Sequence, residues 1–254
     1  MSVPYLIVNW KMHKNHRDLE AYAQALEHHW ERLDPSKVRC IILAPFTLLH
    51  RAHQLWKAYP LELGAQNLHW SPQGAWTGEI SPTQLRDLGL NYALIGHSER
   101  RQWLGEEAER IPEKIQGALK AGLCPILCLG ESLQERRQGK TRAILEGGLE
   151  EALKAVEKGA RFQVAYEPLW AIGTGQSAPT DAIQEAHLWL RHKLRKLLGA
   201  EGDQVPLLYG GSVQEDNIRS ILAIPQVNGV LVGSAGLDPQ RLLDLASLAS
   251  KEAP

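Results

Sequence analysis

The sequence predicts a closed α/β barrel of eight consecutive strand–helix units, (β/α)8, in one domain that spans residues 1–254. Short apolar runs alternate along the whole chain with longer amphipathic segments, which is the pattern of a parallel sheet covered by helices. Eight such units can close on themselves and remove both sheet edges. A doubly wound open sheet also fits the alternation, but it usually has fewer strands, and no G-x-G-x-x-G motif follows Val8. The expected strands are Tyr5–Val8, Val38–Leu43, Leu61–Ala65, Tyr92–Ile95, Cys124–Leu129, Gln163–Tyr166, Val205–Tyr209 and Gly229–Val232.

The segments between these strands carry apolar residues at helical spacing. In Asp18–Glu31 one stripe contains Leu19, Tyr22, Ala23, Leu26 and Trp30. Thr180–Leu198 has a similar stripe, and Asp181 lies near its start, where an acidic side chain suits the helix dipole. We therefore expect both segments to be helices on the outside of the barrel.

Composition and charge exclude several classes of partner. The formal net charge is −1 and the pI is about 6.8, so electrostatics give no reason to expect a nucleic acid or an anionic membrane. The first residues, Met1-Ser-Val-Pro-Tyr-Leu, lack the basic region and cleavage site of a signal peptide, so none is expected, and no apolar run approaches the ~20 residues that cross a bilayer. A cytoplasmic protein is the simplest interpretation.

Cysteine and histidine usage predicts neither a disulfide nor a metal site. Cys124 and Cys128 lie four residues apart in one expected strand, roughly 13 Å, which is beyond the reach of a disulfide. With Cys40 they are expected to be reduced, buried thiols. Histidine pairs such as His50 and His53 could bind a metal on a helix, but no carboxylate-rich motif accompanies them. Surface or core histidines are the preferred interpretation.

The stretch 164–175 combines a buried strand end with a carboxylate and a glycine-rich turn. Glu167 follows the strand, and Pro168 prevents the strand from continuing its ladder of hydrogen bonds. Gly173 and Gly175 flank Thr174, so the backbone there can approach a ligand closely. This pattern indicates a carboxylate base beside a movable loop that covers a phosphate. The alternative is an edge-strand glutamate followed by an ordinary turn.

Two other strand ends carry candidate functional groups. After the first strand, Lys11 could offset a phosphate or an oxyanion, and Asn9 could orient it. After the fourth, Ser98 can cap a short helix, whose amino terminus would keep the His97 imidazole neutral. A surface lysine and a structural histidine are the alternatives. Glu131, after the fifth strand, is interpreted as structural support.

The last two strands end in glycine turns that expose backbone N–H groups. These turns are Tyr209-Gly-Gly-Ser-Val213 and Gly233-Ser-Ala-Gly236, and the second leads into a possible short helix. Phosphate sites in barrels of this kind commonly lie after strands seven and eight. The two turns together therefore predict a phosphate-binding nest.

One long connection, Gln66–Glu79, separates the third expected strand from the next helix. It contains Trp70 and Trp76, which would form an exposed apolar patch unless something covered them. We expect a subunit interface here. The alternative is a loop that folds back on its own domain.

Four motifs, in the same order along the chain, make the sequence resemble the triosephosphate isomerase family. They are Asn9-Trp-Lys-Met12, Gly96-His-Ser-Glu-Arg-Arg101, Ala165-Tyr-Glu-Pro-Leu-Trp-Ala-Ile-Gly-Thr-Gly175 and Tyr209-Gly-Gly-Ser-Val213, and they extend over most of the chain. Gly64-Ala-Gln-Asn67 and Thr77-Gly-Glu-Ile80 are similar to the two ends of the family's dimer loop. The resemblance implies a TIM barrel, a homodimer and no metal or organic cofactor.

The resemblance also implies a reaction, the interconversion of dihydroxyacetone phosphate and D-glyceraldehyde 3-phosphate in glycolysis and gluconeogenesis. Glu167 would be the base that moves a proton between C1 and C2, and His97 the neutral electrophile. Lys11 would stabilise the enediolate and the phosphate, with Asn9 and Glu99 in support. The substrate and phosphate would be bound by Asn9, Lys11, Gly173, Ser212, Gly233 and Ser234. The lid would comprise Pro168, Leu169, Trp170, Ala171, Ile172, Gly173, Thr174, Gly175, Gln176, Ser177 and Ala178, and the dimer loop would include Trp70, Trp76, Thr77 and Gly78.

Some positions depart from the family pattern. His13 stands where the family commonly has Asn, and Gln176-Ser177 replaces Lys-Thr in the lid. Ser234 interrupts a usual Gly-Gly pair, and a positive φ there would cost about 1–3 kcal/mol of strain. Two rivals to the isomerase function are a barrel that acts on a larger sugar phosphate and a non-catalytic phospho-ligand protein, the second of which would be expected to lack Glu167, His97 or Lys11.

Overall fold

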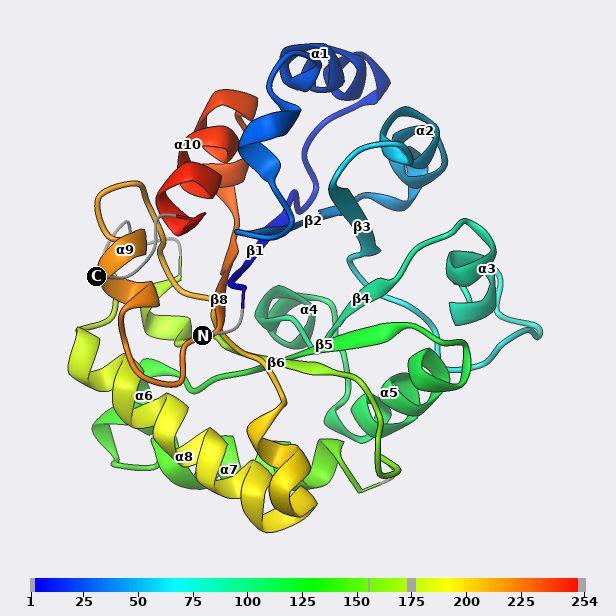
Figure 1. Cartoon of the computed structure of the whole chain (residues 1–254). Helices are drawn as coiled ribbons and strands as arrows, with labels where there is room; N and C mark the ends of the chain where they lie inside the picture. The colour runs from blue at the N-terminus through cyan, green and yellow to red at the C-terminus, as the bar shows by residue number, and fades with distance from the viewer. Residues whose placement is uncertain (1–2, 155, 173–176, 251–254) are drawn as a thin grey trace.

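A computed structural model describes residues 3–154, 156–172 and 177–250, and it has the expected closed barrel of parallel strands (Figure 1). Each strand pairs with the next in sequence, and β1 pairs with β8, so the fold class is confirmed. The strands are β1 Tyr5–Asn9, β2 Arg39–Ala44, β3 Leu61–Ala65, β4 Tyr92–Ile95, β5 Cys124–Leu129, β6 Gln163–Tyr166, β7 Leu207–Tyr209 and β8 Gly229–Val232.

The strand boundaries agree with the sequence prediction to within two residues, and β1 ends at Asn9, one residue later than predicted. β7 begins at Leu207, two residues later than predicted. Pro206 has no N–H, although its carbonyl oxygen still accepts from Val164 at 3.0 Å. β2 runs from Arg39 to Ala44, one residue later than predicted at each end.

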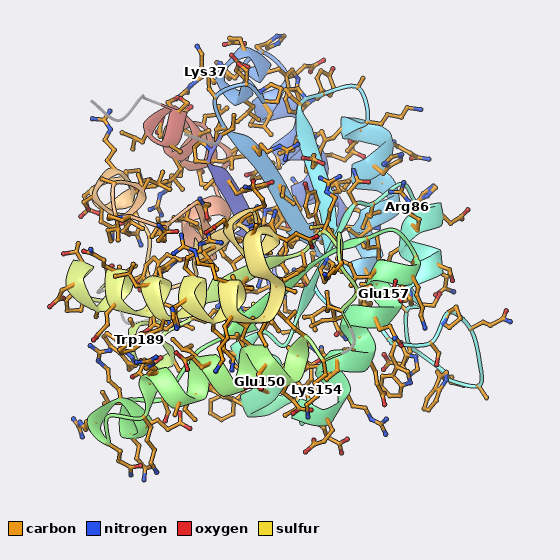
Figure 2. All side chains as sticks on the ribbon, turned by 60° about the horizontal axis from the view of Figure 1, so that its bottom comes forward. Lys37, Arg86, Glu150, Lys154, Glu157 and Trp189 are labelled. Carbon is orange, nitrogen blue, oxygen red and sulfur yellow. The ribbon has the colours of Figure 1, made fainter. Side chains whose placement is uncertain are left out.

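Helices form the outer layer of the barrel in a ring around the strands (Figure 1). Figure 2 shows α7 and α8 side by side, and Lys193 of α8 pairs with Glu150 of α7 across their contact. Among the described residues, no helix is both long and apolar enough to cross a membrane. The helices are α1 His16–Leu26, α2 Phe46–Trp56, α3 Pro82–Asp87, α4 Ser98–Trp103, α5 Ile111–Lys120, α6 Leu133–Arg137, α7 Thr141–Ala152, α8 Thr180–Leu198, α9 Ile218–Leu222 and α10 Pro239–Ser250.

The structure confirms the predicted boundaries of one of the two helices predicted from apolar spacing and changes those of the other. α8 has both predicted ends. α1 begins earlier than predicted because Asn15 caps it, accepting from the Asp18 N–H at 3.1 Å while the Asp18 side chain accepts from the Asn15 N–H. It ends at Leu26, and Trp30 lies in a separate turn, where it stacks on Tyr59 with ring centroids 4.0 Å apart.

The apolar core has two parts. One lies between the strands and the helices, and the other fills the barrel with inward side chains such as Ile7, Ile41, Leu94 and Ile126. Gly64 also faces inward, where an added Cβ would lie 2.6 Å from Leu43. Side chains therefore fill the interior of the barrel, and ligands are expected to bind at its ends.

His187 is a fully buried titratable group between α8 and the barrel. Its Nδ1 lies 2.8 Å from the carbonyl oxygen of Ile183, and its ring packs edge-on to Tyr166. Burial lowers the pKa of His187 to about 4 from its ordinary value of 6.5. The folded protein therefore holds this imidazole neutral over a range in which the unfolded chain would protonate it.

We expect His187 to make stability depend on pH below neutrality. Between about pH 6.5 and 4 the unfolded state binds the extra proton, so stability is full above this range and falls by about 3 kcal/mol across it. Denaturant unfolding at several pH values should show a shallower dependence in His187→Asn than in the parent, whereas the same change at exposed His16 should leave the dependence intact. Equal slopes for parent and His187→Asn would contradict the assignment.

Candidate active site

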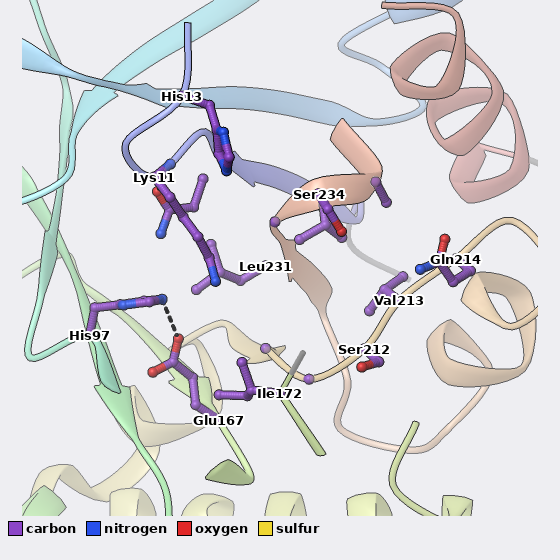
Figure 3. A pocket seen from close by; sticks show the side chains of 16 residues that line it. Lys11, His13, His97, Glu167, Ile172, Ser212, Val213, Gln214, Leu231 and Ser234 are labelled. Atoms are coloured by element: carbon purple, nitrogen blue, oxygen red, sulfur yellow. Dashed lines mark hydrogen bonds and ion pairs between the residues drawn. The ribbon is translucent and has the colours of Figure 1, made fainter. Parts of the chain in front are cut away.

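A cavity of about 400 Å³ lies at the carboxyl ends of the strands (Figure 3). It brings together candidate residues that are far apart in sequence. Those lining it include Asn9, Lys11, His97, Glu167, Ser212, Gly233 and Ser234. His13, one of the departures from the family pattern, also lines the cavity. Glu99 does not line it but pairs with Lys11.

Glu167 occupies the centre of a hydrogen-bonded arrangement just beyond β6. It is only 1% exposed, and its Oε2 accepts from the Ser98 N–H at 3.0 Å. Its Oε1 lies 3.2 Å from Nε2 of His97, as the dashed line in Figure 3 marks. Because the sheet is closed and Glu167 is buried, the edge-strand interpretation of this residue is wrong.

The His97 ring caps the amino terminus of α4. Its Nδ1 accepts from the Glu99 N–H at 3.3 Å. A ring nitrogen that accepts carries no proton, so a neutral His97 has its hydrogen on Nε2, which faces Glu167. The prediction that Ser98 caps this helix is wrong: His97 occupies the cap position, and the Ser98 N–H is directed to Glu167.

Lys11 has a left-handed backbone conformation, with φ at +50°. Two side chains hold this turn: Asn9 Oδ1 accepts from the Lys11 N–H at 2.9 Å, and Gln66 Nε2 donates to the Lys11 carbonyl at 2.8 Å. The Lys11 ammonium lies 2.6 Å from Glu99. Gln66 was not among the predicted site residues; it was singled out only as part of the long loop and of the motif Gly64-Ala-Gln-Asn67.

Two glycines allow the chain to pass closely around Glu167. An added Cβ on Gly130 would lie 1.7 Å from the Glu167 carbonyl oxygen, and one on Gly210 would lie 2.9 Å from its Cγ. Any side chain at either position would therefore displace Glu167. The sequence indicated a glycine turn at Gly210 but not this contact.

The two glycine turns after β7 and β8 face the same cavity. Gly211 and Ser212 line it from one turn, and Gly233 and Ser234 from the other. Among described non-glycine residues, positive φ values occur at Lys11, Lys14 and Gln226, and therefore not at Ser234. The strain considered for Ser234 is absent, and its turn continues into a single 3₁₀ turn, Ser234–Gly236.

The first half of the predicted lid is anchored to a buried carboxylate. Glu131 is fully buried, and its Oε1 accepts from Trp170 Nε1 at 2.8 Å and from the Tyr166 hydroxyl at 3.1 Å. Arg136 lies over the Trp170 ring, 4.4 Å from its centroid. Glu131, interpreted from sequence as structural support, thus holds Trp170 at the start of the predicted lid.

The end of the predicted lid is anchored through Tyr209. Its hydroxyl accepts from the Ala178 N–H at 3.0 Å and lies 3.3 Å from the Ser177 hydroxyl. On the cavity side, Ser212 donates to the carbonyl of Ala171 at 2.7 Å. The predicted lid residues Gly173, Thr174, Gly175 and Gln176 lie outside the described residues.

The long loop after β3 is folded partly on itself and partly exposed. Trp70 packs edge-on to Trp76 with centroids 5.4 Å apart, and His69 contacts both rings. Trp76 remains 48% exposed, and the neighbouring Thr77 and Gly78 are exposed as well. The loop thus presents an aromatic surface to its surroundings.

The fold and the site are those of a (β/α)8-barrel enzyme whose ionisable groups meet at the carboxyl ends of the strands. A sequence profile described as triosephosphate isomerase matches residues 4–249. The chain belongs to the triosephosphate isomerase family.

Individual relatives match along nearly their whole length. The triosephosphate isomerase of Chlamydia muridarum (strain MoPn / Nigg) is 41% identical over 240 residues, covering 94% of this chain and 88% of the relative. That of Synechococcus sp. (strain JA-3-3Ab) is 45% identical over 242 residues, covering 93% and 92%. The crystal structure of triosephosphate isomerase from Bartonella henselae superposes with a TM-score of 0.86 at 33% identity, covering 98% of this chain and 99% of that one.

The close approach of Gly210 to Glu167 gives a direct test of the site geometry. We expect Gly210→Ala to lower isomerase turnover by about 10- to 100-fold, because a displacement of about 1 Å in a reacting group can cost that much. Its melting temperature should change little by comparison. Gly147→Ala on α7 is the matched control, since an added Cβ there meets nothing within 4 Å. Normal turnover in Gly210→Ala would show that Glu167 is not held as described.

Proposed function

We propose that the protein interconverts dihydroxyacetone phosphate and D-glyceraldehyde 3-phosphate by proton transfer through an enediolate. The observation that carries this proposal is the buried Glu167 carboxylate, 3.2 Å from Nε2 of His97 and in the same cavity as two glycine turns. Membership of the triosephosphate isomerase family supports the same reaction.

The reaction needs a base and a hydrogen-bond donor that act together, because a proton beside a carbonyl is only weakly acidic. Glu167 is the base that removes the proton from one substrate carbon and returns it to the neighbouring carbon. His97 donates from Nε2 to the carbonyl oxygen and stabilises the charge that develops there. An incoming carbonyl replaces Glu167 as the partner of His97, which frees the carboxylate to turn toward the substrate.

Lys11 and the glycine turns bind the charged part of the substrate. The Lys11 ammonium neutralises the enediolate and the phosphate, and its pairing with Glu99 keeps it extended along the cavity. Backbone N–H groups near Ser212 and Ser234 bind the phosphate oxygens. The lid, held at its ends by Glu131 and Tyr209, closes over the phosphate and excludes water from the enediolate.

Replacing the base tests this assignment. We expect Glu167→Gln to lower the rate of triose phosphate interconversion by about 10³-fold, within the range attributed to a positioned general base. Glu185→Gln, the same chemical change at an exposed position on α8, controls for handling and for contaminating host enzyme. Loss of activity in both variants, or in neither, would overturn the role of Glu167.

We further propose that the active form is a homodimer joined through the loop 66–79. Trp76 is 48% exposed, and Met12, after β1, is 97% exposed. Trp103 at the end of α4 and Leu104 after it are also largely exposed. All of these residues belong to segments that follow β1, β3 or β4, so burying them against a second copy would remove a large apolar area from water. Loop contacts to the partner would also stiffen the turn that contains Lys11.

Disrupting the loop should shift the oligomeric state. Analytical ultracentrifugation of the parent is expected to give a dimer, and Trp76→Asp should dissociate at least tenfold more readily, because a charge would replace a buried aromatic side chain. Leu188→Asp on α8 removes a similarly exposed apolar residue outside the loop and should stay dimeric. A monomeric parent would contradict the proposed assembly.

The remaining sequence expectations stay predictions. They are the cytoplasmic location, the absence of a nucleic-acid or membrane partner, and catalysis without a metal or organic cofactor.

A further inference from the structure

A second cavity, of about 360 Å³, lies at the amino ends of the strands and plays no part in the proposed reaction. The first residues of several strands form its floor, among them Tyr5, Tyr92, Cys124 and Gln163. One wall comes from the segment that joins α7 to β6, which carries Glu157 in Figure 2. The residues just before β7 provide another wall.

The packed barrel interior separates this cavity from the active site. On β6, Gln163 and Ala165 belong to the inward-facing set, and Glu167 follows two residues later. Glu167 lies four positions after Gln163 along the chain, about 13 Å at the spacing of a strand. Inward side chains such as Ile7 and Ile126 fill the space between the two ends. The two cavities are therefore distinct binding volumes.

Gln163 gives the reason to expect a ligand. It is 2% exposed, and within the described part of the chain its Oε1 has no hydrogen-bond partner. Buried carbonyl oxygens are normally hydrogen-bonded, so this acceptor, on a residue that lines the cavity, is a position for a donor from a bound molecule. A cationic donor such as an ammonium group would suit it best.

Other polar groups on the cavity have complementary chemistry. The Tyr5 hydroxyl oxygen accepts from Arg39 at 2.8 Å, which leaves the hydroxyl proton available to donate. Arg161 is exposed on the cavity wall, and among described residues it forms no ion pair with a carboxylate. Glu201 accepts from the Gly159 N–H through Oε2 at 2.9 Å. Its other carboxylate oxygen, Oε1, can accept a hydrogen bond from a ligand.

The rest of the wall is apolar or uncharged. Phe162 and Val205 are buried hydrophobic residues, and Pro206 continues their surface. Burial raises the pKa of the Cys124 thiol to about 11, so near neutral pH the thiol is protonated and weakly polar. The cavity thus combines a cation, a carboxylate, an unpartnered acceptor and an apolar wall.

We propose that this cavity binds a free α-amino acid with an apolar side chain. The Arg161 guanidinium and the Tyr5 hydroxyl bind the ligand carboxylate. Gln163 Oε1 and the Glu201 carboxylate accept from its ammonium, and the side chain packs against Phe162 and Val205. A zwitterion uses both charges of the wall, which a simple anion or a simple amine does not. This inference is independent of the proposed catalytic roles.

Calorimetric titration of the full-length protein with L-leucine tests the proposal. We expect saturable binding of one L-leucine per chain at millimolar concentration. Two matched probes remove one charge each: 4-methylpentanoate lacks the ammonium group, and 3-methylbutan-1-amine lacks the carboxylate. Each should bind at least tenfold more weakly than L-leucine. If L-leucine, L-valine and L-phenylalanine all fail to bind, or if either probe binds as well as L-leucine, the proposal is wrong.

Variants connect the binding to the cavity. Arg161→Gln and Gln163→Leu should each weaken L-leucine binding by about 10- to 100-fold, the range expected for loss of a hydrogen bond to a charged group. Arg17→Gln, an exposed arginine on α1, should bind like the parent. Gln163→Leu changes a buried residue, so a melting curve checks that the variant folds. Arg161→Gln changes an exposed residue and is expected to leave folding intact. Unchanged affinity in a folded Arg161→Gln protein would overturn the site.

Discussion

Closure of the parallel sheet is the constraint on which the rest of the structure depends. Once β8 pairs with β1, no strand has an open edge, and the carboxyl ends of all strands converge on one face. Residues from β1, β4, β6, β7 and β8 can then meet around one small volume although they are spread over more than two hundred positions of the chain. The packed interior limits the depth of that volume, because a cluster of buried inward side chains fills the barrel below it.

Within this frame, each charged group of the site is held by a neighbour that also sets its chemistry. Glu167 accepts from a backbone N–H and faces the ring of His97, while that ring is held in one tautomer by the backbone of α4. Lys11 is paired with Glu99, which extends from the same short helix. The fourth strand end therefore orients both the Glu167 carboxylate and the Lys11 ammonium group, so the site behaves as one connected unit.

Local patterns predicted the fold and the candidate residues because the relevant signals are short in sequence. The stripe of α8 and the glycine turns after β7 and β8 are visible within a few residues. The missed features depend on contacts between distant segments. The cap role of His97 needs the geometry of a helix start, and the support of Lys11 by Gln66 joins the ends of β1 and β3. The tight fit of Gly130 against Glu167 joins β5 and β6. The spacing of apolar residues within one segment cannot predict contacts between two segments that are far apart in the sequence.

The backbone of Lys11 illustrates a conflict between folding and function. A φ of +50° suits glycine, and a lysine in this conformation costs stability of order 1–3 kcal/mol. Glycine would relieve the strain, but it would also remove the ammonium group from the cavity. The chain keeps the lysine and surrounds it with Asn9 and Gln66, which compensate through hydrogen bonds. With the role proposed for Lys11, the most stable sequence for this barrel is not the most active one, and selection for thermal stability alone would be expected to erode the active site first at such positions.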